Sequence, residues 1–238
     1  MTQILSRAAR CGIPLTPLQA ERLTRYHALL LDWNTRMDLT AVTEEDEMLD
    51  RHYMDSLLPL SMPERFPLEG SIIDVGTGAG FPGLPLAIAL PEARITLLDA
   101  QQKRLTFLQA VIDDLELENV TLVHARAEDG ARQKELRERF DWALARAVAP
   151  LNVLAEYLLP YVRVGGSALC WKGPGVREEL TAGKRAAFLL GASLEEPVPA
   201  PIPGRDWQHL LVRLEKNAST PKIYPRKAGT PSKKPLGT

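Results

Sequence analysis

From residue 71 onward, short β-branched segments alternate with segments of helical periodicity, and this alternation constrains the fold more than any other feature. The expected strands are 71–75, 94–98, 120–124, 141–145 and 167–171, and the expected helices include 84–90, 150–162 and 176–190. Strands and helices that alternate at this spacing form βαβ units, whose parallel sheet is covered by helices on both faces. A final apolar run, 209–214, follows a proline-rich stretch that favours an edge or a loop. The sequence therefore predicts an α/β protein with a mostly parallel sheet.

The chain before this region is expected to be helical. A stripe at helical spacing follows Pro17 and consists of Leu18, Tyr26, Leu29, Leu30 and Trp33. A second helix is expected to start at Thr43, because the acidic residues 44–47 suit the positive end of a helix dipole. Prolines and a glycine between 59 and 70 mark a linker. We therefore divide the chain into an N-terminal helical extension (1–69), a sheet domain (70–215) and a C-terminal tail (216–238).

The C-terminal tail is basic, although the whole chain has a net charge of only −1. It contains no Asp or Glu, and its cations are Lys216, Lys222, Arg226, Lys227, Lys233 and Lys234. Its prolines prevent a continuous helix or a central strand. One interpretation is a solvated, disordered terminus. The other is an arm that binds a polyanion, for which RNA is the best fit.

The sequence disfavours secreted, membrane and metal-binding proteins. The longest uncharged stretch, 75–91, has 17 residues but includes four glycines and three prolines, whereas a spanning helix needs about 20 apolar residues. The N-terminus lacks the hydrophobic block of a secretion signal. Cys11 and Cys170 are too isolated for a disulfide framework or a zinc site, and Cys170 is expected to be a small buried apolar residue. We therefore expect a cytoplasmic protein without a structural metal.

The first strand of the sheet region ends in a glycine-rich turn. Residues 74–83 read Asp-Val-Gly-Thr-Gly-Ala-Gly-Phe-Pro-Gly, so Gly76, Gly78 and Gly80 let the backbone approach a ligand closely. A dinucleotide fingerprint would need its third glycine at position 81, where this chain has Phe81. The pattern favours a nucleoside with an amino-acid end, as in S-adenosylmethionine, over a pyrophosphate. A purely structural tight turn is the alternative.

The ends of the next two strands carry polar groups that suit the rest of such a ligand. In open parallel sheets, ligands bind beyond the carboxyl ends of the strands. Asp99 follows the second strand, and its carboxylate can accept hydrogen bonds from both hydroxyls of a ribose or cap the helix that begins near Gln101. The turn 125–129 follows the third strand and offers a backbone amide and a side-chain acceptor to an adenine edge. Together the three strand ends predict an S-adenosylmethionine site.

In such a sheet the end of the fourth strand faces the substrate that accepts the methyl group. Its residues therefore indicate which kind of atom is methylated. Residues 145–150 contain neither an Asn or Asp before a Pro-Pro-aromatic sequence nor a cysteine placed to attack a pyrimidine. Guanine N7 fits, because it is an unprotonated acceptor and catalysis then consists largely of positioning. We assign no catalytic residue, but expect Arg146 to shape the cofactor or acceptor pocket. Lys172, after the fifth strand, is expected to hold phosphate unless it is an ordinary exposed lysine.

Motifs along nearly the whole chain together resemble one known family. They are the glycine-rich turn 74–83, Leu98-Asp99, Ala145-Arg146-Ala147, Trp171-Lys172-Gly173, Tyr224-Pro225-Arg226-Lys227 and Lys233-Lys234-Pro235-Leu236, with Trp33-Asn34 and the segments 38–41 and 52–57 in the N-terminal region. This combination resembles the ribosomal RNA small subunit methyltransferase G family, also called glucose-inhibited division protein B. His52 and Asp55 fall in one motif, and we expect them to form a buried hydrogen-bonded pair that fixes the helical layer. Many members have Arg-His-Leu where this chain has Gln208-His209-Leu210; if that arginine holds RNA in those members, Arg205 or another cation must replace it here.

The resemblance implies a Rossmann-like S-adenosylmethionine-dependent methyltransferase fold with a seven-stranded, mostly parallel sheet and added N-terminal helices. It implies methylation of N7 of guanine 527 in 16S rRNA, with S-adenosylmethionine as the donor. Cofactor contacts are expected at Asp74, Gly76, Gly78, Phe81, Asp99, Ala100, Ala127, Glu128 and Arg146. We expect a cytoplasmic monomer that binds the small ribosomal subunit and neither DNA nor a membrane.

Two alternatives share the cofactor site with this hypothesis. A methyltransferase that acts on a small molecule or a protein would gain nothing from a basic tail. A regulator that only senses S-adenosylmethionine would bind it without turnover.

Overall fold

A computed structural model describes residues 2–42, 44–146 and 149–238. Its strands are β1 (Ser71–Val75), β2 (Arg94–Asp99), β3 (Val120–His124), β4 (Phe140–Arg146), β5 (Val162–Lys172), β6 (Ala192–Leu194), β7 (Val198–Pro199) and β8 (Leu210–Lys216). The N-terminal helices are α1 (Thr2–Arg10), α2 (Pro17–Asn34), α3 (Glu45–Met48), the π-helical turn η1 (Leu49–Met54), α4 (Asp55–Leu57) and the 3₁₀ turn η2 (Leu58–Ser61). The later helices are α5 (Gly83–Ala89), α6 (Gln102–Asp114), α7 (Ala127–Gly130), α8 (Leu151–Leu158), α9 (Val176–Leu189) and α10 (Thr230–Lys233).

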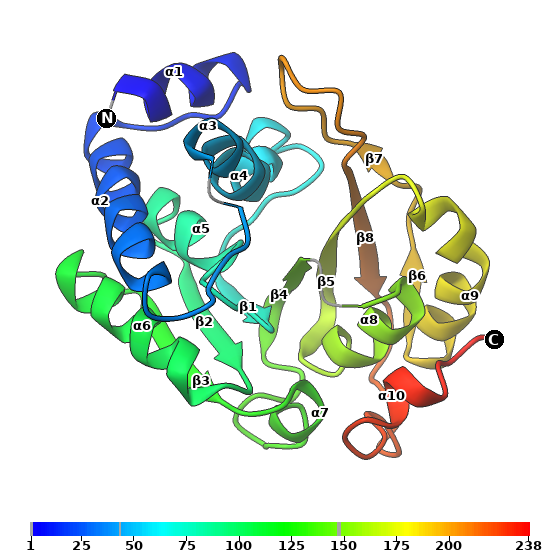
Figure 1. Ribbon diagram of the computed structural model, residues 1–238. Coiled ribbons are helices and arrows are strands. Elements are labelled where there is room, and N and C mark those ends of the chain that lie inside the picture. The colour runs from blue at the N-terminus through cyan, green and yellow to red at the C-terminus, as the bar shows by residue number, and fades with distance from the viewer. Residues whose placement is uncertain (1, 43, 147–148) are drawn as a thin grey trace.

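The strands form one sheet in the order β3-β2-β1-β4-β5-β8-β6, with β7 beside β8 at the edge (Figure 1). Strands β1 to β5 pair in parallel, and β8 pairs antiparallel with β5, β6 and β7. The chain therefore turns from one half of the sheet to the other between β1 and β4, and such a reversal opens a crevice at the carboxyl ends of the strands. The α/β class is confirmed. The sheet has eight strands rather than seven, because Val198–Pro199 adds a two-residue edge strand.

The fifth strand differs most from the sequence expectation. It begins at Val162 rather than at residue 167, and the preceding helix ends at Leu158. The added residues 163–165 are exposed, and Arg163 and Gly165 flank the single apolar Val164, so they do not extend the apolar run that begins at residue 167. Gly165 has a φ of 84°, which allows the strand to bend at that point.

The helix α2 forms as expected, but one residue of the predicted buried stripe is exposed. Thr16 caps it: the Thr16 hydroxyl accepts from the Gln19 amide while the Gln19 side chain accepts from the Thr16 amide. Tyr26 and Leu30 are buried, whereas Leu18 is 58% exposed because it lies in the first turn, outside the contact with the sheet layer. The expected helix start at Thr43 lies outside the described residues, and in the described part Glu44 caps α3.

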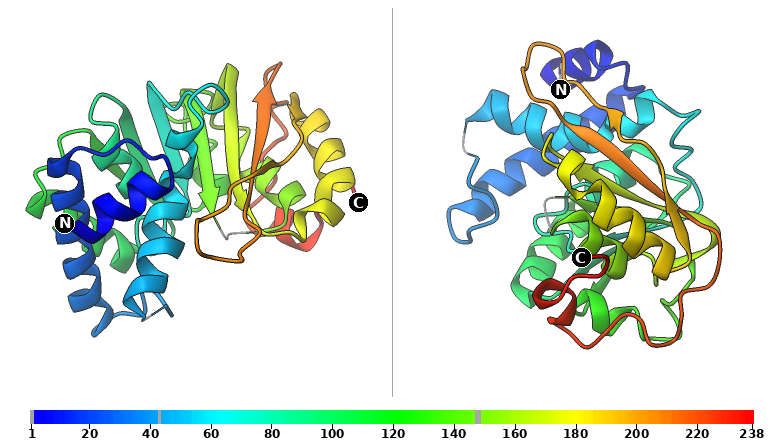
Figure 2. Two further views of the ribbon diagram at one scale, coloured as in Figure 1. Left: turned by 90° about the horizontal axis from the view of Figure 1, so that it is seen from above. Right: turned by 90° about the vertical axis from the view of Figure 1, so that its right-hand side faces the viewer.

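Helices cover both faces of the sheet (Figures 1 and 2), and an apolar cluster fills each interface between helices and sheet. On one face, the N-terminal helices, α5 and α6 share a hydrophobic cluster with inward side chains such as Ile72, Ile95 and Leu144. On the other face, α8 and α9 pack against residues such as Ile73 and Ala143. The N-terminal helices are thus one layer of the same core. No helix among the described residues combines the length and the apolar character of a membrane span.

The tail is ordered along the α8 side of the sheet, and two of its cations are not available to a polyanion. Lys216 belongs to β8 and is buried, and its ammonium donates to the Leu159 carbonyl at 2.7 Å and lies 3.3 Å from Glu138. Burial lowers the pKa of Lys216 to about 8. Arg226 forms an ion pair with Glu156. Local acids and carbonyls already engage these two of the six tail cations, so neither is free to bind a phosphate.

Candidate nucleoside and acceptor site

A cavity of about 840 Å³ lies at the carboxyl ends of β1 to β4, where the sheet order reverses. The predicted cofactor residues that line it are Gly76, Gly78, Phe81, Asp99, Ala100, Ala127, Glu128 and Arg146. The N-terminal layer contributes Leu39, Thr40 and His52, and the other face contributes Tyr157. We call this space the nucleoside cavity. It is within the size range of ligand pockets, about 300–1,000 Å³.

The glycine-rich turn after β1 forms one wall of the nucleoside cavity. Gly76, Gly78 and Gly80 have φ angles of 77°, 62° and 103°, which residues with a Cβ atom rarely adopt. A Cβ atom on Gly80 would lie 2.7 Å from the Tyr26 hydroxyl, which donates to the Ala79 carbonyl. The backbone conformation and the packing of α2 therefore both require this glycine.

Asp74 supports the turn from beneath and does not line the cavity. Its Oδ2 accepts from the Thr77 hydroxyl at 2.7 Å and from the Gly83 amide at 2.9 Å. Burial raises the pKa of Asp74 to about 6. The structure therefore places Asp74 as a brace across the turn, whereas the sequence analysis assigns it a contact with the ligand.

Asp99, at the end of β2, is buried and faces the nucleoside cavity. Its Oδ2 accepts from the Gly78 amide at 2.9 Å and its Oδ1 from the Gln101 amide at 2.8 Å, while Arg104 lies 3.4 Å away. The cap position of α6 is occupied by Gln101 rather than by Asp99. A carboxylate has about four acceptor sites, so Asp99 ties the glycine turn to α6 and still has acceptor capacity for a ligand.

Arg146, at the end of β4, joins the sheet to the N-terminal layer. Its guanidinium donates to the Arg51 carbonyl at 2.7 Å, to Asp55 Oδ2 at 3.2 Å and to His52 Nδ1 at 3.2 Å. It also lies 5.2 Å from the centre of the Phe81 ring. The expected pair between His52 and Asp55 is therefore replaced by an arrangement in which both side chains bind Arg146, because they occupy successive turns of the helical layer facing the end of β4.

His52 is held in one protonation state. Arginine only donates, so His52 Nδ1 accepts from Arg146 and the proton lies on Nε2, which is 2.8 Å from the Thr40 hydroxyl. Burial and the Arg146 cation lower the pKa of His52 to about 4. Its ring stacks on Phe81 with centroids 4.9 Å apart. A neutral, fixed imidazole therefore forms the wall of the cavity beside Phe81.

A second cavity of about 300 Å³ adjoins the first and shares His52 and Arg146 with it. The remaining lining residues are Arg51, Asp55, Ala149, Trp171, Lys172, Gly173 and His209. Asp55 accepts from His209 Nδ1 at 2.8 Å and from Arg146, so it connects the residue before β8 to the end of β4. We call this space the acceptor cavity.

Lys172 lines the acceptor cavity but is already engaged. Its ammonium lies 2.8 Å from Glu179 and 3.1 Å from the Ala149 carbonyl, and its side chain is only 12% exposed. A phosphate at this point would have to compete with Glu179. Lys172 is therefore neither an exposed surface lysine nor a free phosphate ligand, and its contacts tie the loop after β4 to α9.

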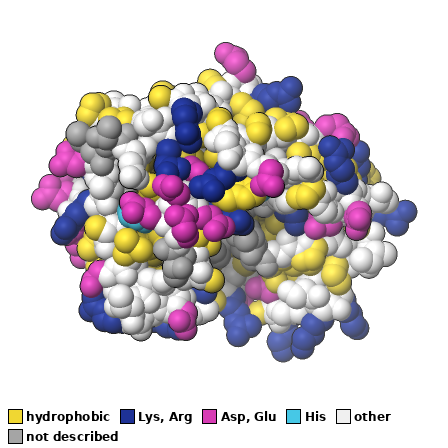
Figure 3. All heavy atoms as spheres, turned by 45° about the horizontal axis from the view of Figure 1, so that its top comes forward, with side chains coloured by type: hydrophobic (Ala, Val, Ile, Leu, Met, Phe, Trp, Pro, Cys, Tyr) yellow, Lys and Arg dark blue, Asp and Glu magenta, His cyan; other side chains and the backbone are white. Residues whose placement is uncertain are grey.

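Cationic side chains flank an aromatic ring at the rim of the acceptor cavity. The guanidinium groups of Arg51 and Arg205 lie 4.5 Å and 5.1 Å from the Trp207 ring, which stacks on His209. Arg205 also binds the buried carboxylate of Asp50 at 2.7 Å. On the face shown in Figure 3, acidic and basic side chains are interspersed rather than segregated into one patch.

The nucleoside cavity is also lined by groups to which the sequence analysis assigned no role, among them Thr40, Arg104, Tyr157, Gly229 and Ser232. Thr40 belongs to a motif of the resemblance, but its contact with His52 depends on the fold. Tyr157, Gly229 and Ser232 carry no local signal, because they reach the cavity from α8 and the C-terminal tail. Cys170 is fully buried as expected, and burial raises its pKa to about 12. Within the described part of the chain, no cluster of three or more His, Cys, Asp or Glu side chains is placed to hold a metal ion.

Comparison with solved structures shows the methyltransferase fold. A 16S rRNA (adenine(1408)-N(1))-methyltransferase from Catenulisporales acidiphilia aligns with a TM-score of 0.51 and 18% identity, over 63% of this chain and 86% of that chain. A fibrillarin pre-rRNA processing protein from Methanococcus jannaschii aligns with a TM-score of 0.51 and 15% identity, over 63% and 68% of the two chains. The fold is therefore the Rossmann-like methyltransferase fold that the sequence predicts.

Comparison of sequences is more specific. A family model described as rRNA small subunit methyltransferase G matches residues 19–200. Proteins called ribosomal RNA small subunit methyltransferase G from Alkaliphilus metalliredigens and Clostridium perfringens are 46% and 47% identical over 225 residues, which is 94% of each chain. The protein of that name from Alkaliphilus oremlandii is 45% identical over 237 residues and covers 99% of both chains. Because the match extends from the N-terminal helices to the tail, this chain belongs to the rRNA small subunit methyltransferase G family.

Proposed function

We propose that the protein methylates N7 of guanine 527 in 16S rRNA, with S-adenosylmethionine in the nucleoside cavity and the target guanine in the acceptor cavity. The observation that carries the proposal is that the two cavities share His52 and Arg146, so two ligands bound there would be neighbours. The names of the relatives specify small-subunit rRNA as the acceptor of those proteins.

The groups around the nucleoside cavity fit S-adenosylmethionine. A Cβ atom placed on Gly78 would meet no atom within 4 Å, so the turn leaves open space for the amino-acid end. Asp99 offers acceptor sites to ribose hydroxyls, and Glu128 offers one to the adenine amine. S-adenosylmethionine, when bound, supplies a methyl group on a positively charged sulfur.

The acceptor cavity has to position guanine rather than activate it. Guanine N7 carries a lone pair and no proton. As N7 bonds to the methyl carbon, the electrons of the broken carbon–sulfur bond return to sulfur, and no proton has to leave. A general base is unnecessary, so we assign Arg146 and His52 the role of fixing the two ligands in line. Trp171 and His209 line the cavity with ring surfaces suited to an unpaired base.

A labelling experiment tests the proposal directly. The protein is incubated with methyl-tritiated S-adenosylmethionine and small subunits that lack the modification, and the labelled nucleotide is then mapped. We expect label at N7 of guanine 527, and none when the subunits are already modified at that base. Label at another nucleotide would contradict the assignment of the base. Label only in a small molecule or a protein would support the rival class of methyltransferase.

The tail predicts a measurable salt dependence of RNA binding. Lys222, Lys227, Lys233 and Lys234 are exposed and have no ion pair among the described residues. Each phosphate contact on single-stranded RNA contributes about −0.7 to the slope of log affinity against log salt, so four contacts contribute about −3. We expect replacement of all four by Gln to flatten the slope by that amount, measured by filter binding to the subunit, whereas Lys184→Gln leaves it unchanged. An equal slope in the fourfold variant would show that these lysines touch no phosphate.

A further inference from the structure

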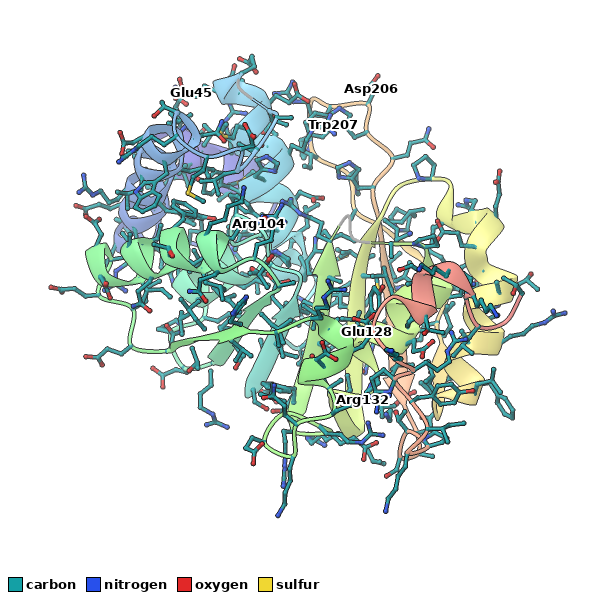
Figure 4. The ribbon with its side chains drawn as sticks, turned by 60° about the horizontal axis from the view of Figure 1, so that its bottom comes forward. Glu45, Arg104, Glu128, Arg132, Asp206 and Trp207 are labelled. Atoms are coloured by element: carbon teal, nitrogen blue, oxygen red, sulfur yellow. The ribbon has the colours of Figure 1, made fainter. Side chains whose placement is uncertain are left out.

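Residues 217–238, which we call the C-terminal segment, follow a path fixed by side chains of the sheet domain. Arg137 donates to the carbonyls of Tyr224 and Thr220 at 2.9 Å. Arg132, which is labelled in Figure 4, donates to the Pro225 carbonyl at 2.6 Å. Farther along, Asn152 donates to the Leu236 carbonyl at 2.9 Å. Donors thus hold the backbone of the segment at both ends, which a solvated tail would not require.

The strongest anchor of the C-terminal segment is Arg226. Its guanidinium donates to Glu156 on α8 at 2.6 Å and 3.0 Å, and its backbone amide donates to the same carboxylate at 2.7 Å. Glu156 is fully buried. A buried carboxylate needs a partner, and here the partner comes only from the C-terminal segment among the hydrogen bonds of the described residues. The position of the segment is therefore coupled to the interior of the domain.

The anchor brings two residues of the segment to the nucleoside cavity. The Gly229 amide donates to Glu128 Oε1 at 2.7 Å, and the Ser232 hydroxyl lies 2.7 Å from the Tyr157 hydroxyl. Gly229, Ser232, Tyr157 and Glu128 all line the cavity, together with Ala127, which precedes Glu128 on α7. Glu128 is only 5% exposed, so its orientation depends on these contacts.

We propose that the C-terminal segment is a wall of the nucleoside cavity that makes it selective for adenine. The Gly229 amide occupies one oxygen of Glu128 and thereby directs the other oxygen to the base, where an acceptor favours the adenine amine over a carbonyl. Arg226 is a positioning residue that acts through Glu156 and Gly229. This inference rests on the proposed function, because it assumes that the nucleoside cavity binds the methyl donor.

Calorimetric titration with two ligands tests this role. The ligands are S-adenosylhomocysteine and S-inosylhomocysteine, which differ at the position of the amine. We expect the original protein to prefer the adenosyl ligand at least about tenfold, the effect of one hydrogen bond to a charged group. In Arg226→Ala, we expect weaker binding of the adenosyl ligand and a preference that falls below about threefold, with Arg226→Lys between the two.

Arg25→Ala is the matched control, because Arg25 also makes two 2.7 Å bonds to a carboxylate, that of Asp114, but lies outside the cavity. It should change neither affinity nor preference. A folded Arg226→Ala variant with the original preference would overturn the proposal, since a purely structural anchor would lower stability without changing the ratio. If the original protein bound neither ligand, the proposed function would fail as well.

A second pair of variants covers the case in which Arg226→Ala does not fold. Ser232→Phe adds a ring to the proposed wall, whereas Ile223→Phe adds a ring at an exposed position of the same segment that does not line the cavity. We expect S-adenosylhomocysteine to bind at least about tenfold more weakly to Ser232→Phe and unchanged to Ile223→Phe. Equal affinities in the two variants would overturn the assignment of the segment as a wall.

Discussion

Arg146→Lys will lower the rate of methyl transfer about a hundredfold and will change the affinity for S-adenosylmethionine much less, because small displacements of positioned groups have effects of that size. Lysine retains the positive charge beside the buried carboxylate of Asp55. It cannot reproduce the planar fork with which Arg146 reaches the Arg51 carbonyl and His52 Nδ1 together. The wall shared by the two cavities therefore loses its fixed geometry while the charge remains.

Lysine is the informative substitution, because alanine would leave Asp55 without its cation and destabilise the fold by about 3–5 kcal/mol. Single-turnover rates on unmodified subunits measure the effect, with thermal unfolding as the test of the fold. Arg213→Lys is the matched control, since Arg213 also lies over an aromatic ring, that of Trp142, but lines neither cavity. A folded Arg146→Lys variant with the original rate would show that Arg146 does not position the reactants.

The sequence predicts those parts of the site that depend on residues close to one another along the chain. The strand β3 coincides with its expected bounds, because β-branched residues dominate it. The glycine turn and Asp99 follow from the rule that ligands bind at strand ends, and both line the nucleoside cavity. Each of these features depends on residues within a few positions of one another.

The parts that the sequence does not predict depend on contacts between distant segments. Arg146 binds His52 on η1 and Asp55 on α4, which are 94 and 91 positions away, and Glu128 binds Gly229 across 101 positions. The basic composition of the tail suggests a solvated arm, but Glu156 is a buried acid whose burial no local pattern reveals. The charge of the tail therefore does not predict its position, which depends on its contact with the buried Glu156.

Asp99→Ala will weaken binding of S-adenosylmethionine about a hundredfold. Two of the about four acceptor sites of the carboxylate bind the Gly78 and Gln101 amides, and the other two are expected to accept the ribose hydroxyls in place of the 3.4 Å contact with Arg104. Hydrogen bonds to a charged group are worth about 1.5 kcal/mol or more each, where 1.4 kcal/mol is tenfold in affinity. Removal of the side chain also frees the Gly78 and Gln101 amides that it now binds. Calorimetry measures the loss, and circular dichroism establishes that the variant is folded.

The surface variant Asp114→Ala provides the comparison. Asp114 is paired with Arg25 outside the cavity, so its removal should leave the affinity unchanged. If Asp99→Ala and Asp114→Ala bound S-adenosylmethionine with equal affinity, Asp99 would not be a ligand-binding residue.

The most direct measurement separates the ribose contact from the support that Asp99 gives to the turn. S-adenosylhomocysteine and its 2′,3′-dideoxy counterpart are titrated into the original protein and into Asp99→Ala. We predict that the original protein prefers the hydroxylated ligand about a hundredfold, and that the variant prefers it less than about threefold. A preference that persists undiminished in folded Asp99→Ala would mean that the ribose is held elsewhere, and the placement of the donor across this end of the sheet would then be wrong.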